Sequence, residues 1–97
     1  MRIEIEEQVL RFIRNLAPEP RRLLKSALRR LESEKGDIKA LEDELSGFFR
    51  LRQGPYRIVF RYCESRGERV IRCEFAERRP LVYEVLAEAL KARIEGD

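Results

Sequence analysis

Apolar and charged side chains alternate from Phe48 to Glu77, and this period of two is typical of β-strands. Two turns divide the alternation: Gln53-Gly54, and a second turn with Arg66-Gly67 at its tip. A chain that alternates on both sides of two short turns favours neighbouring antiparallel strands. We therefore predict three strands, at residues 48–52, 55–63 and 69–77.

The first half of the chain follows the period of a helix. Two apolar groups recur at helical spacing, one on each side of Pro18 and Pro20. Proline suits the first turn of a helix and not its interior, so one helix ends before this pair and another begins there. Residues 6–35 thus predict a helical hairpin whose apolar faces are Val9, Phe12, Ile13 and Leu16, then Leu24, Ala27, Leu28 and Leu31.

Three shorter segments complete the predicted layout. Residues 2–5 alternate and predict a short first strand, whereas residues 38–46 predict a less regular connector with room for one helical turn. Pro80 begins a last helix, and Val82, Leu86, Ala89 and Leu90 share one face of it. The predicted order is β-α-α-β-β-β-α. It describes an α+β fold in a single domain, residues 1–97, with a helical hairpin packed on an antiparallel sheet and a helix at the C-terminus.

The composition excludes several classes of protein. The 97 residues contain no histidine and two cysteines, Cys63 and Cys73. Ser-His-Asp and Cys-His catalysis and His-ligated metal sites are therefore impossible, and two cysteines cannot form a four-cysteine zinc site. We expect no metal and no cofactor. No apolar run approaches about 18 residues and no apolar signal region follows Met1, so we expect a cytoplasmic protein that does not bind membranes. Its cysteines should stay reduced, as small core or sheet residues.

Positive charge gathers in the middle of the chain. The whole sequence has 21 basic and 18 acidic residues, a net charge of +3. Residues 47–83 alone hold nine arginines, no lysine and four glutamates, a net charge of +5. The distribution of the arginines over the predicted strands therefore decides what the charge can bind.

Side chains alternate across a strand, so the register assigns each of them to one of two faces. With Gln53-Gly54 and Arg66-Gly67 as turns, Arg50 lies opposite Arg57, and Ile58 lies opposite both Phe49 and Phe75. One face is then apolar and forms the core against the helices: Phe49, Leu51, Tyr56, Ile58, Phe60, Tyr62, Ile71, Cys73 and Phe75. The other face carries Phe48, Val59, Val70, Glu74, Ala76 and five arginines: Arg50, Arg52, Arg57, Arg61 and Arg72.

Opposed like charges destabilise a pair of strands, and an anion bound between them would offset that repulsion. Arginine binds phosphate through two parallel hydrogen bonds. Five arginines on one face, with Arg50 and Arg57 opposed, therefore predict a polyanion-binding face. The alternative is a solvated sheet face, on which arginine merely covers apolar surface.

The segment from Leu45 to Phe60 reads LSGFFRLRQGPYRIVF. This combination of a glycine, a basic strand, a turn and then Tyr-Arg before an apolar run resembles the core of the RelE/ParE toxin superfamily. Residues 79–83, read as Arg-x-x-Val-Tyr, are similar to the final motif of that family, and residues 36–41 to the stretch that precedes its basic strand. The motifs occur in the family's order, cover nearly the whole chain and match the predicted layout.

The resemblance implies a type II toxin that is encoded beside an antitoxin. RelE-like members are ribosome-dependent endoribonucleases that cut mRNA in the A site, whereas ParE-like members share the fold and poison DNA gyrase. The implied partners are thus a cognate antitoxin and either mRNA on the ribosome or DNA gyrase. A nucleic-acid-binding domain without toxicity is the third hypothesis. The antitoxin is expected to lay an amphipathic segment over helical grooves, with Phe48 as a candidate contact.

The resemblance also implies roles for single residues. Arg57 matches the active-site arginine of the central strand, Arg50 a basic position usually filled by lysine, and Tyr83 the tyrosine that stacks on the substrate base. Phe48 stands where a lysine is common, and Glu77 where RelE has a second arginine. We therefore expect Arg57, Arg50, Tyr83 and Arg79 to be catalytic and Arg52, Arg61, Arg72 and Arg78 to bind RNA, with Glu77 or Glu74 as the candidate base.

Overall fold

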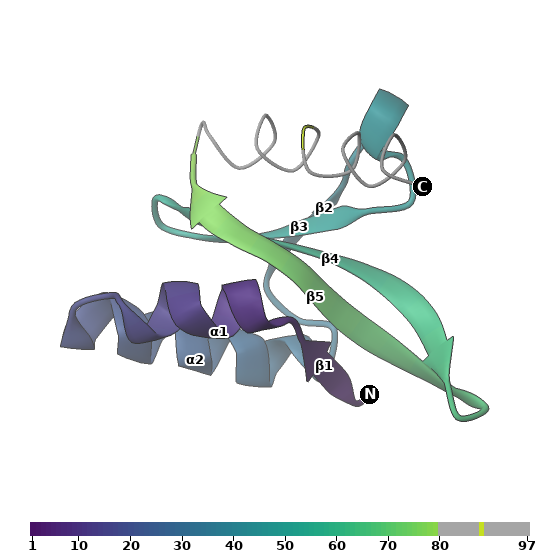
Figure 1. Cartoon of the computed structure of the whole chain (residues 1–97), viewed down its shortest axis with the longest axis horizontal. Helices are drawn as coiled ribbons and strands as arrows, with labels where there is room; N and C mark the ends of the chain where they lie inside the picture. Colours follow the sequence, from purple (N-terminus) through teal and green to yellow (C-terminus); the bar gives the residue numbers. More distant parts are fainter. Residues whose placement is uncertain (80–87, 89–97) are drawn as a thin grey trace.

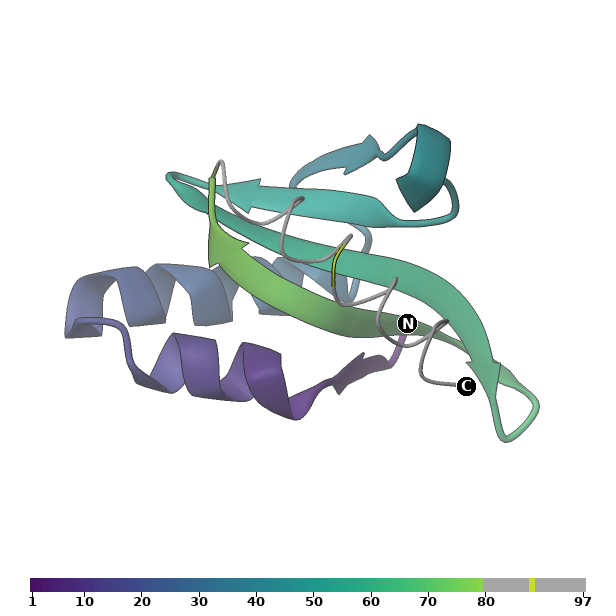
Figure 2. The same cartoon turned by 45° about the horizontal axis from the view of Figure 1, so that its top comes forward.

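The computed structural model describes residues 1–79 and Glu88, and the described residues form a twisted sheet with two helices against one of its faces (Figure 1). Helices α1 (Glu7–Arg14) and α2 (Pro18–Leu31) form the predicted hairpin. The strands are β1 (Ile3–Ile5), β2 (Asp37–Ala40), β3 (Phe49–Gln53), β4 (Tyr56–Ser65) and β5 (Glu68–Arg78). A short 3-10 helix, η1 (Asp43–Leu45), follows β2. Figure 2 shows both helices on the same side of the sheet.

The strands lie in the order β1-β5-β4-β3-β2. Strands β2 to β5 pair antiparallel, as predicted, but β1 pairs parallel with β5, which makes the sheet mixed. The helical hairpin connects β1, at one edge of the sheet, with β2, at the other edge. The predicted α+β fold class is confirmed. The predicted C-terminal helix, which begins at Pro80, lies outside the described residues apart from Glu88.

The prediction of a connector for residues 38–46 is wrong in its first part. Asp37 to Ala40 form an edge strand beside β3, and only residues 43–45 form the helical turn. Four residues are too few for a clear period of two, yet the strand alternates. Ile38 packs against the core, while Asp37 and Lys39 alternate to the opposite face.

The turn between β3 and β4 lies one residue later than predicted. Gln53 pairs with Tyr56, so Gly54 and Pro55 form the turn, and Gly54 adopts a φ of +58° that favours glycine. The shift keeps each side chain on its predicted face but changes its partner. Arg57 lies opposite Arg52, not Arg50, and Arg50 lies opposite Val59.

A β-bulge in β5 changes the predicted faces at the end of that strand. Phe60 pairs with Cys73 as predicted, but Val59 pairs with Phe75 and Ile58 with Ala76, so Glu74 has no partner in the ladder. The extra residue moves Phe75 to the outer face of the sheet and Ala76 into the core. The prediction for these two residues is therefore wrong.

The core lies between the sheet and the helical hairpin. Leu24, Leu31, Ile58, Phe60 and Ile71 are fully buried there, and each large apolar side chain stabilises the fold by about 1.5–3 kcal/mol. Apart from Phe75, every residue predicted for the core face is buried in this cluster or packs against it. A second, smaller apolar cluster lies on the outer face, where Leu41, Leu45, Phe48 and Phe75 surround Val59.

The two cysteines lie on β4 and β5 as free thiols. Cys73 is fully buried in the core, and this burial raises the pKa of its thiol to about 12. Cys63 is half-buried. In the described part of the chain, no helix combines the length and the apolar character that are needed to span a membrane.

Candidate anion-binding site

A hollow of about 350 Å³ opens on the outer face of the sheet, away from the helices. We call it the basic hollow, because its described lining holds five cationic side chains and one carboxylate. The lining comes from β2 and the residues after it, from β3 and β4, and from the residue that follows β5. It consists of Lys39, Ala40, Leu41, Glu42, Arg50, Arg52, Arg57 and Arg79.

Two neighbouring rows of paired residues cross the sheet at this hollow. The first row runs from β2 to β5 as Asp37, Arg52, Arg57 and Glu77. The second row runs as Lys39, Arg50, Val59 and Phe75. Carboxylates thus flank the opposed arginines of the first row, while the second row carries two positive charges and no negative one. Neighbouring strands lie about 5 Å apart, so long cationic side chains at paired positions can reach one anion together.

Arg57 is the most deeply placed cation of the hollow, with 4% of its surface exposed. Its Nη1 donates hydrogen bonds to the carbonyl oxygen of Gly54 at 2.8 Å and to that of Tyr56 at 2.9 Å. The β3–β4 turn therefore fixes the guanidinium at the floor of the site. A preorganised, buried cation stabilises a negative charge more strongly than a solvated one does.

Asp37 holds the arginines of β3 in place. Arg50 Nη1 donates to the Asp37 carboxylate at 3.0 Å and to its carbonyl oxygen at 2.9 Å, and Arg52 Nε lies 3.8 Å from the carboxylate. The hydrogen bond from Arg50 holds the pKa of Asp37 below its ordinary value, with smaller contributions from the charges of Arg52 and Arg57. The side chain of Arg50 is consequently 14% exposed, although it lies at the protein surface.

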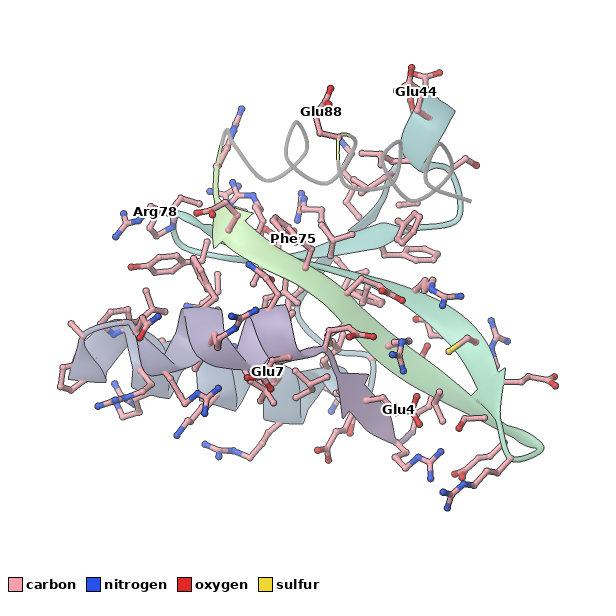
Figure 3. The ribbon with its side chains drawn as sticks, viewed as in Figure 1. Glu4, Glu7, Glu44, Phe75, Arg78 and Glu88 are labelled. Atoms are coloured by element: carbon pink, nitrogen blue, oxygen red, sulfur yellow. The ribbon has the colours of Figure 1, made fainter. Side chains whose placement is uncertain are left out.

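Arg61 and Arg72, two of the predicted RNA-binding residues, lie opposite each other outside the basic hollow. Both contact the buried carboxylate of Glu74, Arg61 at 2.7 Å and Arg72 at 3.5 Å. Arg72 also pairs with two carboxylates at the N-terminus, those of Glu4 at 3.1 Å and of Glu6 (Figure 3 labels Glu4 on β1). These ion pairs tie β1 to the sheet, so the two arginines have a structural role in addition to any contact with RNA.

The other predicted site residues divide between the two faces. The bulge places Arg78, at the end of β5 in Figure 3, opposite Tyr56 on the helix side, where it donates to the Tyr56 hydroxyl at 3.3 Å and lies over its ring. Glu77 shares the row of Arg57, and Phe48 packs in the outer apolar cluster. Tyr83 lies outside the described residues. The structure thus brings Arg50, Arg52, Arg57 and Arg79 together and leaves Arg61, Arg72 and Arg78 elsewhere.

Three charged residues of the site escaped the sequence analysis: Asp37, Lys39 and Glu42. Lys39 and Glu42 lie in the segment that was expected to be a connector, and Asp37 comes directly before it. The alternation in Asp-Ile-Lys-Ala places Asp37 and Lys39 on the face opposite Ile38, but four residues are too few to show a strand by themselves, and Glu42 lies beyond this segment.

No protein-family model matches this sequence, and no curated protein matches it by sequence. Solved structures, however, share its fold, and they are toxins of the RelE/ParE superfamily. The resemblance seen in the sequence is thereby confirmed: the chain has the fold of the RelE/ParE toxins.

Three of these structures show the extent of the likeness. An archaeal RelE–RelB complex from Pyrococcus horikoshii OT3 is 26% identical over 81% of this chain and 94% of that chain, with a TM-score of 0.61. The toxin–antitoxin complex RelBE2 from Mycobacterium tuberculosis is 22% identical over 80% and 96%, with a TM-score of 0.61. A YoeB/ParE toxin from Agrobacterium tumefaciens is 14% identical over 81% and 99%, with a TM-score of 0.64.

Proposed function

We propose that this chain is the toxin of a type II toxin–antitoxin pair and that it cleaves messenger RNA on the ribosome, in the cytoplasm. The observation that carries the proposal is the basic hollow, in which Arg50, Arg52, Arg57 and Arg79 converge with Lys39. A surface with this density of guanidinium groups is suited to phosphate, which arginine binds through paired hydrogen bonds. The toxin fold and the cationic site together support an RNA substrate.

In the proposed reaction, a ribose 2′-hydroxyl attacks the adjacent phosphorus and the bond from phosphorus to the 5′-oxygen breaks. Arg57 and Arg50 stabilise the charge that develops on the phosphorane oxygens, together with Arg79 from the lining of the same hollow. The 2′-hydroxyl proton passes to a carboxylate, for which Glu77 in the row of Arg57 is the candidate, and the departing 5′-oxygen takes a proton from water. Tyr83 is proposed to stack on the substrate base. Arginine stays protonated at neutral pH, so rate enhancement comes mainly from positioning and charge stabilisation, with the ribosome ordering the substrate.

A cognate antitoxin is the proposed protein partner. Three of the similar structures are complexes of a toxin with its antitoxin. In this chain, an apolar groove of about 430 Å³ lies between β1 and the helical hairpin and includes the exposed Leu10. Arg14, Lys25 and Arg29 contribute positive charge to its lining, and Glu32 supplies the one carboxylate among the lining residues that the structure describes. An amphipathic antitoxin segment with acidic flanks would complement this groove.

One observation favours a second function, inhibition of DNA gyrase without catalysis. Asp37 and Glu77 flank the opposed arginines and neutralise that row, and Phe48 adds apolar surface beside the hollow. A face of mixed charge with an apolar patch also suits binding to a protein. Glu77 is therefore a candidate base under the first function and a contact residue under the second.

Pulse labelling after brief induction in a bacterial host separates the two functions, because protein synthesis and DNA synthesis are followed in parallel. We expect protein synthesis to stop first, and Arg57→Ala to lower mRNA cleavage by about 10²-fold or more, the cost of removing one preorganised donor to a developing negative charge. Arg57→Lys keeps the positive charge and serves as the second variant in case Arg57→Ala does not fold. Arg21→Ala on α2 is the control outside the hollow. If DNA synthesis stops first, gyrase is the target. If Arg57→Ala is folded and as toxic as the parent, the assignment of the cleavage site is wrong.

A further inference from the structure

Strand β2 adds a lysine to a site whose other described cations are arginines. Lys39 pairs with Arg50 across β2 and β3, and directly paired residues project from the same face of a sheet, about 5 Å apart at their Cβ atoms. Lys39 and Arg50 both line the basic hollow. Ile38, one residue earlier, points to the opposite face and packs against the core, which fixes the orientation of the strand.

The cationic side chains of the hollow differ in the hydrogen bonds and ion pairs that they already make within the protein. Arg50 and Arg52 face the carboxylate of Asp37, and Arg57 donates to two backbone carbonyl oxygens. Lys39 is exposed, and within residues 1–79 its ammonium group makes no hydrogen bond and no ion pair. Its three donors are therefore available to an incoming anion without the loss of an existing contact.

Lys39 and Arg50 occupy paired positions, so both side chains can contact the same anion. An anion that binds Arg50 lies within reach of the flexible four-carbon stem of Lys39 on the neighbouring strand. The described lining contains one carboxylate, that of Glu42, which follows β2. The row of Lys39 and Arg50 thus contains no acid of its own, and of these two cations only Arg50 contacts a carboxylate, that of Asp37 in the neighbouring row.

We propose that Lys39 contacts the substrate: together with Arg50 it binds a phosphate of the RNA backbone. Strand β2 then contributes directly to substrate binding. The inference rests on the proposed function and deepens it, since it assigns a residue that the fold alone does not indicate. The RNA would then lie across β2 and β3. It would not follow the distal halves of β4 and β5, where Arg61 and Arg72 already form ion pairs with carboxylates.

The test compares Lys39→Ala and Lys39→Arg with Lys35→Ala, an exposed lysine just before β2 that does not line the hollow. Two probes are titrated at several salt concentrations: a single-stranded RNA with 2′-O-methyl groups, which cannot be cleaved, and inorganic pyrophosphate. We expect Lys39→Ala to weaken RNA binding about tenfold at low salt. The slope of log affinity against log salt should fall by about 0.7, the value for one lost contact to a single strand. Lys39→Arg should bind nearly as the parent does, and Lys35→Ala should bind as the parent.

The outcomes distinguish this inference from the proposed function. If Lys39→Ala binds both probes as tightly as Lys35→Ala does, or if the parent binds neither probe, Lys39 is not a phosphate contact. If pyrophosphate binding depends on Lys39 but the parent neither binds nor cleaves RNA, the anion site stands and the proposed function fails. If the parent cleaves mRNA and Lys39→Ala cleaves at the same rate, the inference fails and the proposed function stands.

Discussion

The replacement of Glu74 by glutamine tests the ion pairs at the β-bulge. The Glu74 side chain is 6% exposed, and its carboxylate accepts a hydrogen bond from Arg61 at 2.7 Å and lies 3.5 Å from Arg72. Glutamine keeps an oxygen that can accept from Arg61 but removes the charge. A hydrogen bond to a charged group contributes about 1.5–3 kcal/mol, and a neutral one about 0.5–1.5 kcal/mol.

The expected loss is therefore about 1 kcal/mol in the free energy of unfolding. It lies at the low end of that difference for two reasons. Arg61 is 43% exposed, so solvent screens its attraction to the carboxylate, and Arg72 keeps its contacts with Glu4 and Glu6. For a domain of this size, about 1 kcal/mol lowers the melting temperature by about 4–8 °C.

Denaturant unfolding at pH 7 in low salt measures the change, with Glu64→Gln, an exposed glutamate on β4, as the matched control. The control should unfold within about 0.5 kcal/mol of the parent, as is usual for surface substitutions. In Glu74→Gln, Arg61 loses its compensating charge, so RNA affinity should rise and its salt dependence should steepen. A Glu74→Gln variant as stable as the parent, with unchanged RNA binding, would refute the reasoning that these ion pairs stabilise the bulge and neutralise this end of the sheet.

Two further predictions follow from the other sites. Leu10→Glu should weaken binding of the antitoxin by at least about tenfold, because it places a charge in the apolar groove. Cleavage of mRNA should stay at the parent's rate. Equal antitoxin affinity of the variant and the parent in calorimetry would exclude the groove as the docking site. Asp37→Asn should destabilise the protein fully above about pH 4 and progressively less below it, since the pKa of Asp37 is lowered in the folded state and its contribution is lost as the pH falls through that lowered pKa. The stability difference between Asp37→Asn and the parent should therefore shrink from pH 5 to pH 2.5, and a difference that is constant with pH would contradict the role of the Arg50–Asp37 pair.

Most of the fold could be predicted because its patterns are local. The helical hairpin follows from the spacing of Val9 and Ile13 and of Leu24 and Leu31, and from the prolines between the helices. The core face of β3 and β4 was predicted correctly even though the turn lies one residue later. This change moves each partner by two positions, and a shift of two leaves every side chain on its face.

The errors arose where one residue changes the geometry. A bulge inserts a single residue into β5, and nothing in the alternation of residues 69–77 shows that Glu74 and Phe75 lie on the same face. The segment Asp37–Ala40 is too short to have a period of its own, and its pairing with β3 defines it as a strand. For that reason the sequence analysis found the arginines of the site but not Lys39 or Asp37.

The sequence by itself determined the fold class, the hairpin, the faces of β3 and β4 and the excess of arginine on one face, because each depends on the spacing of side chains along the chain. Only the tertiary structure decided which arginines act together. Arg50, Arg52 and Arg57 meet at the basic hollow because β2 closes one side of it and Asp37 holds two of them there. Arg61 and Arg72 belong to the same face, but Glu74 and the carboxylates of the N-terminal segment compensate them. Charge compensation depends on distances between segments far apart in the chain, and these are set only when the strands pair.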